Sequence, residues 1–164
     1  RPAFIDDGTV TAATSSPLTD GAAATLVCSD EFAEYMDFNY VTEIVSTAIA
    51  GVDPEYMGYG PVPASQLALA RANINIDDLD VIELNEAFSS QALACMHGLG
   101  LNEDDERINI DGGAIAIGHP LGASGCRITG KACSLLNRVQ GEYALATMCI
   151  GGGMGISTVL RHTS

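Results

Sequence analysis

Two glycine-rich turns constrain this chain more than any other feature. Residues 112–125 read GGAIAIGHPLGASG and residues 149–155 read CIGGGMG. Glycine adopts backbone conformations that other residues avoid and lets the backbone approach a neighbouring group closely. The first turn carries His119 and the second begins at Cys149. Because His and Cys exchange protons most readily near neutral pH, we expect the fold to bring both turns to one site.

Strands and helices alternate along the chain, which is typical of a layered α/β sandwich. We predict a mostly parallel, buried sheet that the last two strands, joined by the second glycine turn, make mixed. Helices are expected at 29–38, 64–72, 86–97 and 124–139. Strands are expected at 22–27, 41–50, 81–84, 143–148 and 155–160, with a further short strand and the first glycine turn within 108–117.

Composition and charge exclude several classes of protein. The 164 residues carry a net charge of −14, and Lys131 is the only lysine. Nucleic acids and anionic lipids both require clustered Lys and Arg, so neither is an expected partner. A solvated acidic surface and adaptation to high salt both explain this charge. No apolar run is long enough to insert into a membrane, and the first residues do not resemble a signal peptide.

The five cysteines form no CxxC pair, and no metal-ligand spacing is visible, so we expect no metal site. Unpaired cysteines are typical of a reducing compartment, and we expect a cytoplasmic location. The length is that of a single domain with a real core.

His119 lies between Gly118 and Pro120. The proline disfavours helical backbone at His119, and the helix that follows begins with free N–H groups that favour an anion or oxyanion. Packing of the imidazole in a purely structural turn is the alternative interpretation.

Cys149 and Asn85 each have two interpretations. The glycines after Cys149 could offer backbone N–H groups to a carbonyl oxygen, but Cys149 could also be an ordinary buried strand cysteine. Asn85 follows a predicted strand, so its amide could reach a ligand beyond the carboxyl end of that strand. It could equally be only the N-cap of the next helix.

The combination of motifs resembles the thiolase family. Asn85-Glu86-Ala87-Phe88, the run GHPLGASG at 118–125 and CIGGG at 149–153 occur in the order and spacing of the C-terminal half of a thiolase. The resemblance covers essentially the whole chain. The sequences MGYGPVPAS at 57–65 and ATMCIG at 146–151 are most similar to those of degradative 3-ketoacyl-CoA thiolases of fatty-acid β-oxidation. Ketosynthases are a weaker match, because they typically have a Gly-His-Thr turn and a His or Asn in place of Cys149.

This resemblance implies a layered α/β/α thiolase-like domain with a five-stranded mixed sheet over residues 19–164. Residues 1–18 would be the tail of the thiolase loop domain. The implied activity is that of an acyltransferase that cleaves 3-ketoacyl-CoA to acetyl-CoA and a shortened acyl-CoA, or runs the reverse Claisen condensation. Coenzyme A would be a substrate, with no permanently bound cofactor.

The resemblance also implies a role for each motif residue. His119 would activate the nucleophilic cysteine, and Cys149 would be the second acid/base, with the neighbouring imidazole lowering the pKa of a thiol. Asn85 would hold a water that forms one oxyanion hole with His119, and the N–H of Gly151 would contribute to the second. The substrate would be contacted by Ser16 against the pantetheine arm and by Met57, Ala87 and Phe88 along the acyl or pantetheine tunnel.

Thiolases use a second cysteine, the nucleophile, in an Asn-Arg-x-Cys-x-Ser-Gly-like turn of their N-terminal half. None of the five cysteines has that setting. We therefore expect no turnover by this chain alone and a thiolase N-terminal half as partner, either in the same chain or as a subunit of a split enzyme. A biosynthetic, acetoacetyl-CoA-forming thiolase and a non-catalytic interaction module are further alternatives. The surface on which a thiolase N-terminal half would pack should be apolar and exposed in this chain alone. We therefore expect self-association, with a homo-oligomer as the native state.

Overall fold

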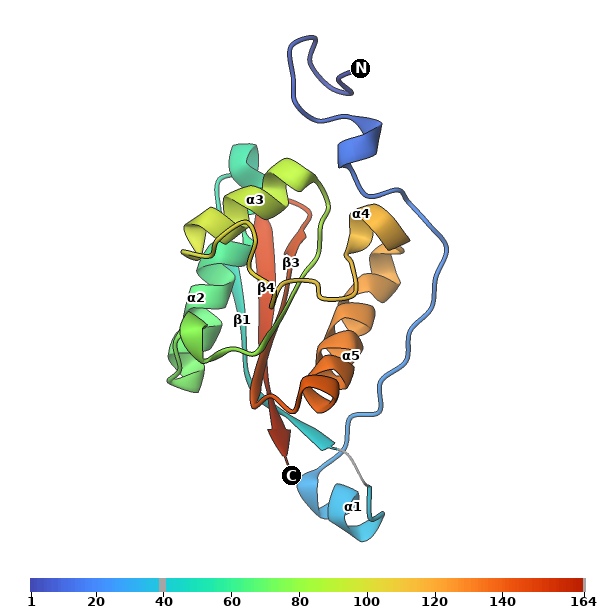
Figure 1. Ribbon diagram of the computed structural model, residues 1–164, viewed down its shortest axis with the longest axis vertical. Coiled ribbons are helices and arrows are strands. Elements are labelled where there is room, and N and C mark those ends of the chain that lie inside the picture. Colours follow the sequence, from blue (N-terminus) through green and yellow to red (C-terminus); the bar gives the residue numbers. More distant parts are fainter. Residues whose placement is uncertain (39–40, 164) are drawn as a thin grey trace.

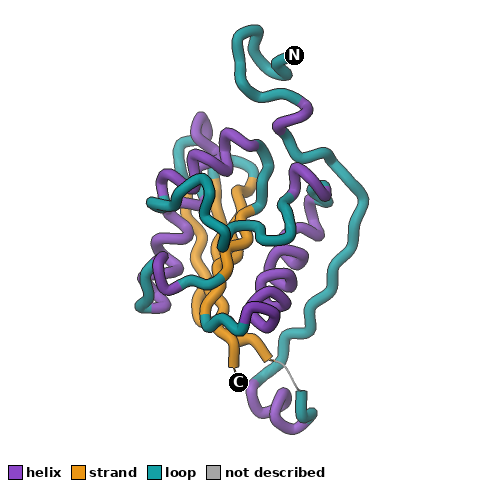
Figure 2. Tube along the Cα trace, in the orientation of Figure 1, coloured by secondary structure: helices purple, strands orange, loops and turns teal. Residues whose placement is uncertain are grey.

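A computed structural model describes residues 1–38 and 41–163 of the chain. Its centre is a sheet whose strands lie in the order β1 (Val41–Gly51), β4 (Met154–Thr163), β3 (Tyr143–Ile150) and β2 (Val81–Leu84). Helix α2 (Pro61–Ala72) covers one face and helix α5 (Leu121–Val139) covers the other (Figure 1). The sheet thus lies between two helical layers (Figure 2), and the predicted α/β/α layering is confirmed.

Shorter elements gather near the carboxyl ends of β2 and β3 (Figure 1). They are the 3-10 helix η2 (Pro54–Tyr59), helix α3 (Ser89–Gly98) and the single turn α4 (Ala114–Ile117). Two further 3-10 turns, η1 (Ala12–Thr14) and η3 (Ile76–Asp78), and the short helix α1 (Asp30–Tyr35) complete the described elements. None of the described helices is long and apolar enough to cross a membrane.

The sheet is mixed, as predicted, but it is not mostly parallel. Among the described strands only β2 and β3 pair in parallel. The glycine turn folds β4 back against β3, and β1 then pairs with the other edge of β4 in antiparallel register from Val41↔Thr163 to Gly51↔Met154. The predicted antiparallel hairpin of the last two strands is therefore correct.

The prediction of five strands is wrong, because the sheet has four. Residues 22–27 are extended and exposed, but no sheet edge lies beside them in the described part of the chain to accept their hydrogen bonds. Ile108 forms one isolated bridge to Ile82. Asn109 follows with a left-handed φ of 47°, which ends the extended backbone, and residues 114–117 are helical instead of extended.

The predicted helices exist, with shifted ends. Helix α2 starts three residues earlier than expected, because Pro61 and Pro63 are tolerated in a first turn where N–H groups have no helical partner. Helix α3 starts three residues later than expected, with Phe88 as its N-cap. Asn85 is therefore not a helix cap. Helix α5 begins directly after Pro120, so the GHPLGASG motif runs into its first turn.

Two apolar clusters hold the layers together, one on each face of the sheet. Alternate residues of β2 point to opposite faces, so Val81 packs under α5 and Ile82 packs under α2 and α3. Each large aliphatic side chain buried in this way contributes roughly 1.5–3 kcal/mol. The α5 face includes Ala144, Leu160, Ala132, Leu135 and Leu136, and the α2 face includes Leu84, Leu145, Val159, Val62 and Ala68.

Candidate functional site

His119 is held by both its backbone and its ring. Its backbone N–H donates to the carbonyl of Pro17 at 3.0 Å, which ties the glycine turn to the N-terminal segment. Its Nδ1 lies 2.6 Å from Oγ of Ser124, a fully buried residue in the first turn of α5. This contact fixes the plane of the imidazole. Within the described residues Nε2 makes no hydrogen bond, so it is the ring nitrogen available to a reacting group.

The surroundings of His119 favour its neutral form. Burial lowers the pKa of the imidazole, and the positive charge of Arg127 lowers it further. A ring that is uncharged near pH 7 has a free lone pair and can accept a proton, which is what a general base requires.

Cys149 lies at the end of β3, opposite Gly155 on β4. The turn between these strands has φ angles of 78° at Gly152 and 83° at Gly153, in the left-handed region that favours glycine. Burial raises the pKa of the Cys149 thiol, so the group is protonated near neutral pH. The predicted lowering of the thiol pKa by a neighbouring imidazole is not seen at Cys149. No hydrogen bond joins His119 to Cys149 in the described part of the chain, and a neutral imidazole has no charge that would stabilise a thiolate.

Asn85 continues the extended backbone of β2, with its N–H donating to the carbonyl of Thr147 at 3.0 Å. The residue is 1% exposed, yet its Oδ1 and Nδ2 both lack a hydrogen-bond partner among the described protein atoms. Buried amides are almost always hydrogen bonded, so this side chain has donor and acceptor capacity to offer a ligand or a buried water.

Gly151 opens the turn after Cys149 and is exposed. A Cβ added at this position would meet no protein atom within 4 Å. The backbone here is therefore approachable, as an oxyanion-hole donor needs to be.

Glu86 and Asn109 join the Asn85 turn to the segment that precedes His119, although neither residue was predicted to have a role. The carboxylate of Glu86 accepts from Nδ2 of Asn109 at 2.7 Å and from the N–H of Ile115 at 3.1 Å. Asn109 also bonds both the N–H and the carbonyl of Leu84. These contacts lock the Asn85 turn to the segment that leads into His119. Their only sequence signal was the presence of Glu86 inside the Asn-Glu-Ala-Phe motif.

A cavity of about 690 Å³ opens between η2 and α3. Met57 and Phe88 lie in its wall, which places two of the four predicted substrate-contacting residues together. The other two lie beside them: the carbonyl of Ala87 accepts from the N–H and the hydroxyl of Ser16, at 3.0 and 3.2 Å. The remaining wall is formed by Val52, Glu55, Tyr56, Gly58, Tyr59, Ser90, Gln91 and Ala94.

No group of three or more His, Cys, Asp or Glu side chains with the geometry of a metal site occurs among the described residues. The cavity between η2 and α3 is lined by none of His119, Cys149, Asn85 and Gly151.

The whole chain is similar to thiolases. A family model described as the thiolase C-terminal domain matches residues 38–162, and one described as the thiolase N-terminal domain matches residues 1–31. The 3-ketoacyl-CoA thiolases of Yersinia pestis (strain Pestoides F) and Vibrio vulnificus (strain YJ016) are 54% and 55% identical to it over 164 residues. Each match covers 99% of this chain but only 42% of the relative.

Two solved structures have the same fold. The acetyl-CoA acetyltransferase of Bacillus anthracis superposes with a TM-score of 0.95 at 38% identity. Human mitochondrial 3-ketoacyl-CoA thiolase in complex with CoA superposes with a TM-score of 0.90 at 42% identity. Each match covers 99% of this chain and 41% of the other. The fold, the family models and the relatives agree: the chain belongs to the thiolase family.

Proposed function

We propose that this chain is the C-terminal catalytic half of a 3-ketoacyl-CoA thiolase, which cleaves 3-ketoacyl-CoA with CoA to acetyl-CoA and a shortened acyl-CoA. The observation that carries the proposal is the joint presence of a neutral, oriented His119, a protonated Cys149 and an unpartnered Asn85 amide in a domain that also holds an apolar cavity lined by Met57 and Phe88. The 3-ketoacyl-CoA thiolase relatives support the choice of substrate class.

In this proposal His119 takes the proton of the nucleophilic cysteine that the N-terminal half supplies. That thiolate attacks the 3-keto carbon, and the bond between carbons 2 and 3 then breaks with its electron pair on the acetyl-CoA fragment. Cys149 donates its proton to that carbanion. Cys149 then takes a proton from the incoming CoA thiol, which attacks the acyl-enzyme and releases the shortened acyl-CoA. The nucleophilic cysteine leaves as a thiolate and takes its proton back from His119.

Two oxyanion sites lower the barriers of these steps. Asn85, through a water shared with His119, holds the thioester oxygen as the enolate forms. The N–H of Gly151 holds the oxygen of the tetrahedral intermediate. Loss of one such donor typically slows catalysis by about 100- to 1,000-fold. Met57 and Phe88 line the acyl or pantetheine tunnel, with Ala87 and Ser16 adjoining it.

The chain alone is proposed to be inactive, and its partners to be a thiolase N-terminal half, in the same chain or in a separate subunit, and a second copy in a homo-oligomer. We place the protein in the cytoplasm, in fatty-acid β-oxidation. A biosynthetic, acetoacetyl-CoA-forming thiolase is the second candidate, and the similarity to an acetyl-CoA acetyltransferase favours it.

The test combines the chain with a thiolase N-terminal half and follows CoA-dependent cleavage of 3-ketoacyl-CoA substrates of increasing length. Activity is expected only with both halves present, and Cys149→Ala and His119→Ala each abolish it. Turnover by this chain alone, or turnover that survives either substitution, contradicts the proposal. Activity restricted to acetoacetyl-CoA selects the biosynthetic candidate.

A further inference from the structure

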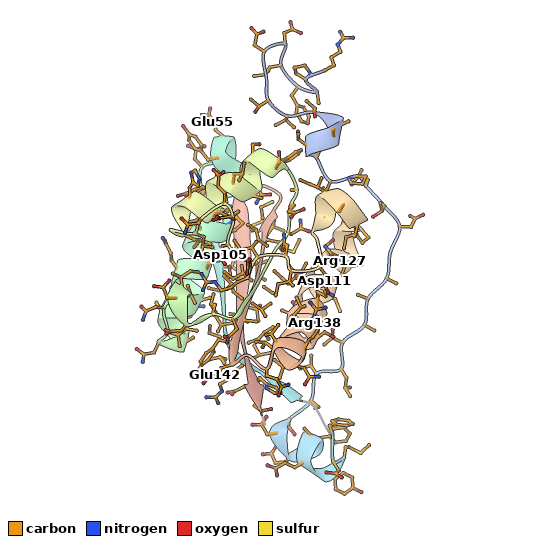
Figure 3. All side chains as sticks on the ribbon, in the orientation of Figure 1. Glu55, Asp105, Asp111, Arg127, Arg138 and Glu142 are labelled. Atoms are coloured by element: carbon orange, nitrogen blue, oxygen red, sulfur yellow. The ribbon has the colours of Figure 1, made fainter. Side chains whose placement is uncertain are left out.

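A buried thiol that the proposed reaction does not use lies beside the cavity between η2 and α3. Cys95 is fully buried in α3, and its Sγ lies 3.3 Å from the carbonyl oxygen of Gly58, on η2. Glu55, on the same 3-10 helix, marks the η2 wall of this cavity in Figure 3, next to α3. Burial raises the pKa of the Cys95 thiol to about 11, so the sulfur keeps its hydrogen at neutral pH and donates it to that carbonyl.

Gln91 holds the other side of this thiol. It precedes Cys95 by four residues and therefore lies on the same face of α3. Its Nε2 donates to Sγ of Cys95 at 3.5 Å, and its Oε1 accepts from the backbone N–H groups of Ala87 and Phe88 at 3.0 and 3.5 Å. Gln91 also packs tightly on η2, because a Cβ added to Gly58 would lie 2.7 Å from Cγ of Gln91.

These contacts form one hydrogen-bond chain with a single direction. A backbone N–H only donates and a carbonyl oxygen only accepts, whereas a thiol does both. The chain therefore starts at the N–H groups of Ala87 and Phe88, passes through the amide of Gln91, and ends at the carbonyl of Gly58. Cys95 is the link that accepts and donates at one atom, so no apolar side chain can replace it.

The two ends of this chain lie on the two elements that form the cavity. Gly58 directly follows Met57 on η2, and Phe88 lies at the start of α3. Ser16 is attached to the α3 end, because the carbonyl of Ala87 accepts from its N–H and its hydroxyl. The chain thus joins all the residues that the sequence predicts to contact the substrate.

We propose that Cys95 and Gln91 are positioning residues, which hold the wall that carries Met57 against the wall that carries Phe88 and thereby set how tightly the cavity binds its substrate. The part of this inference that concerns the substrate rests on the proposed function. Cys95 takes no part in proton transfer, since it gives its hydrogen to a backbone carbonyl. Without the chain, η2 and α3 can move apart, and binding is weakened before any bond of the substrate breaks. We therefore expect the effect in KM and not in kcat.

The first test measures the geometry and does not depend on the proposed function. Donation to a carbonyl lowers the stretching frequency of a thiol S–H bond, which infrared spectroscopy of the complete protein records. The difference spectrum between the wild type and Cys95→Ser isolates the band of this thiol from those of the other cysteines. We expect the low frequency of a hydrogen-bonded thiol. A band at the frequency of a free thiol overturns the inference.

The second test follows the chain from its centre to one end. Cys95→Ala removes the donor and the acceptor, whereas Cys95→Ser keeps both on a side chain of similar size. Hydrogen exchange at the amides of Ala87 and Phe88 is expected to be about tenfold faster in the alanine variant than in the serine variant, because Gln91 is no longer held. Equal exchange in the two variants contradicts the proposed chain.

The third test uses the protein completed by its thiolase N-terminal half. Cys95→Ala is expected to raise the KM for 3-ketoacyl-CoA about tenfold while kcat stays within about twofold, and Cys95→Ser to avoid most of that rise. Cys133→Ala is the matched control, since it removes a partly buried thiol from the other face of the sheet. An unchanged KM, a fall in kcat alone, or a serine variant as impaired as the alanine variant overturns the inference.

A double-mutant cycle shows whether the two residues act as one unit. Gln91→Met keeps the length of the side chain but makes none of its hydrogen bonds, so Cys95→Ala should raise KM no further in this background. Increases that multiply overturn the inference. If the completed protein cleaves no 3-ketoacyl-CoA, the proposed function fails, and the thiol band and the amide exchange decide the inference. Should Cys95→Ala fail to fold, Gln91→Met replaces it in the exchange and kinetic tests.

Discussion

His119 Nδ1 and Ser124 Oγ lie 2.6 Å apart, and this contact joins the glycine turn to the first turn of α5. The two residues are five apart in the sequence, so a short piece of chain both carries the imidazole and orients it. The buried hydroxyl also determines that Nε2, and not Nδ1, faces any reacting group.

Ser124→Ala removes this contact and leaves the ring free to rotate. We expect a fall in kcat of about tenfold or more in the assembled enzyme, because a base that samples several orientations is rarely aligned with the proton it takes. The cost in unfolding free energy is about 0.5–1.5 kcal/mol, as for one hydrogen bond. Ser134→Ala, at an exposed position of the same helix, is the control. Equal kinetics for the two variants contradict the orienting role.

Gly113 lies against the carboxylate of Glu86, so close that a Cβ at this position would collide with it. Gly113→Ala is therefore expected to destabilise the fold by about 1–3 kcal/mol, because Glu86 must give up its bonds to Asn109 and Ile115. Gly122→Ala is the matched control, since a Cβ there meets nothing within 4 Å and the residue is helical. The control should be stabilised by about 0.5–1 kcal/mol. Denaturant unfolding measures both, and equal effects would refute the steric argument.

Glu83 is expected to make stability depend on pH. Burial raises the pKa of its carboxyl from 4.5 to about 7, although the charges of Arg127 and Lys131 oppose the rise. The folded state thus holds the proton more tightly than the unfolded state. The stabilisation is complete below pH 4.5 and is lost as the pH rises through about 7. At 1.36 kcal/mol per pKa unit, this loss is roughly 3 kcal/mol.

Comparison of the wild type with Glu83→Gln isolates this contribution from those of other carboxyl groups. The difference in unfolding free energy between the two proteins should change by a few kcal/mol between pH 4.5 and 7 and be level above it. A difference that is flat across this range would show that Glu83 titrates normally.

Exposed apolar residues of the N-terminal segment predict self-association of the isolated chain. Leu26 and Val27 are 71% and 72% exposed in the extended stretch that pairs with no strand in the described part of the chain. Apolar side chains gathered in this way favour contact with a second surface. Sedimentation velocity should show association that rises with concentration and falls in Leu26→Ser/Val27→Ser, with an unchanged melting temperature. A chain that stays monomeric at every concentration would rule this out.

Local patterns predicted most of the elements correctly. The β-branched run at 41–50, the hairpin around the second glycine turn and the helix after His119 all lie within a few residues of their predicted positions. These succeed because propensity, turn chemistry and apolar periodicity act over short distances. The predictions of five strands and of a mostly parallel sheet were wrong, because strand pairing depends on which strand edges meet in space. Residues 22–27 have the composition of a strand but no edge beside them, and Asn109 ends the strand predicted near Ile108.

The sequence by itself determined the family, and it predicts His119, Cys149 and Asn85 as the reactive residues because each lies in a short motif of that family. Only the tertiary structure decided their chemical state. Burial keeps the thiol of Cys149 protonated, and Glu86 with Asn109 fastens the Asn85 turn to the His119 segment. Burial and long-range hydrogen bonds arise between residues far apart in the sequence, so no local pattern records them.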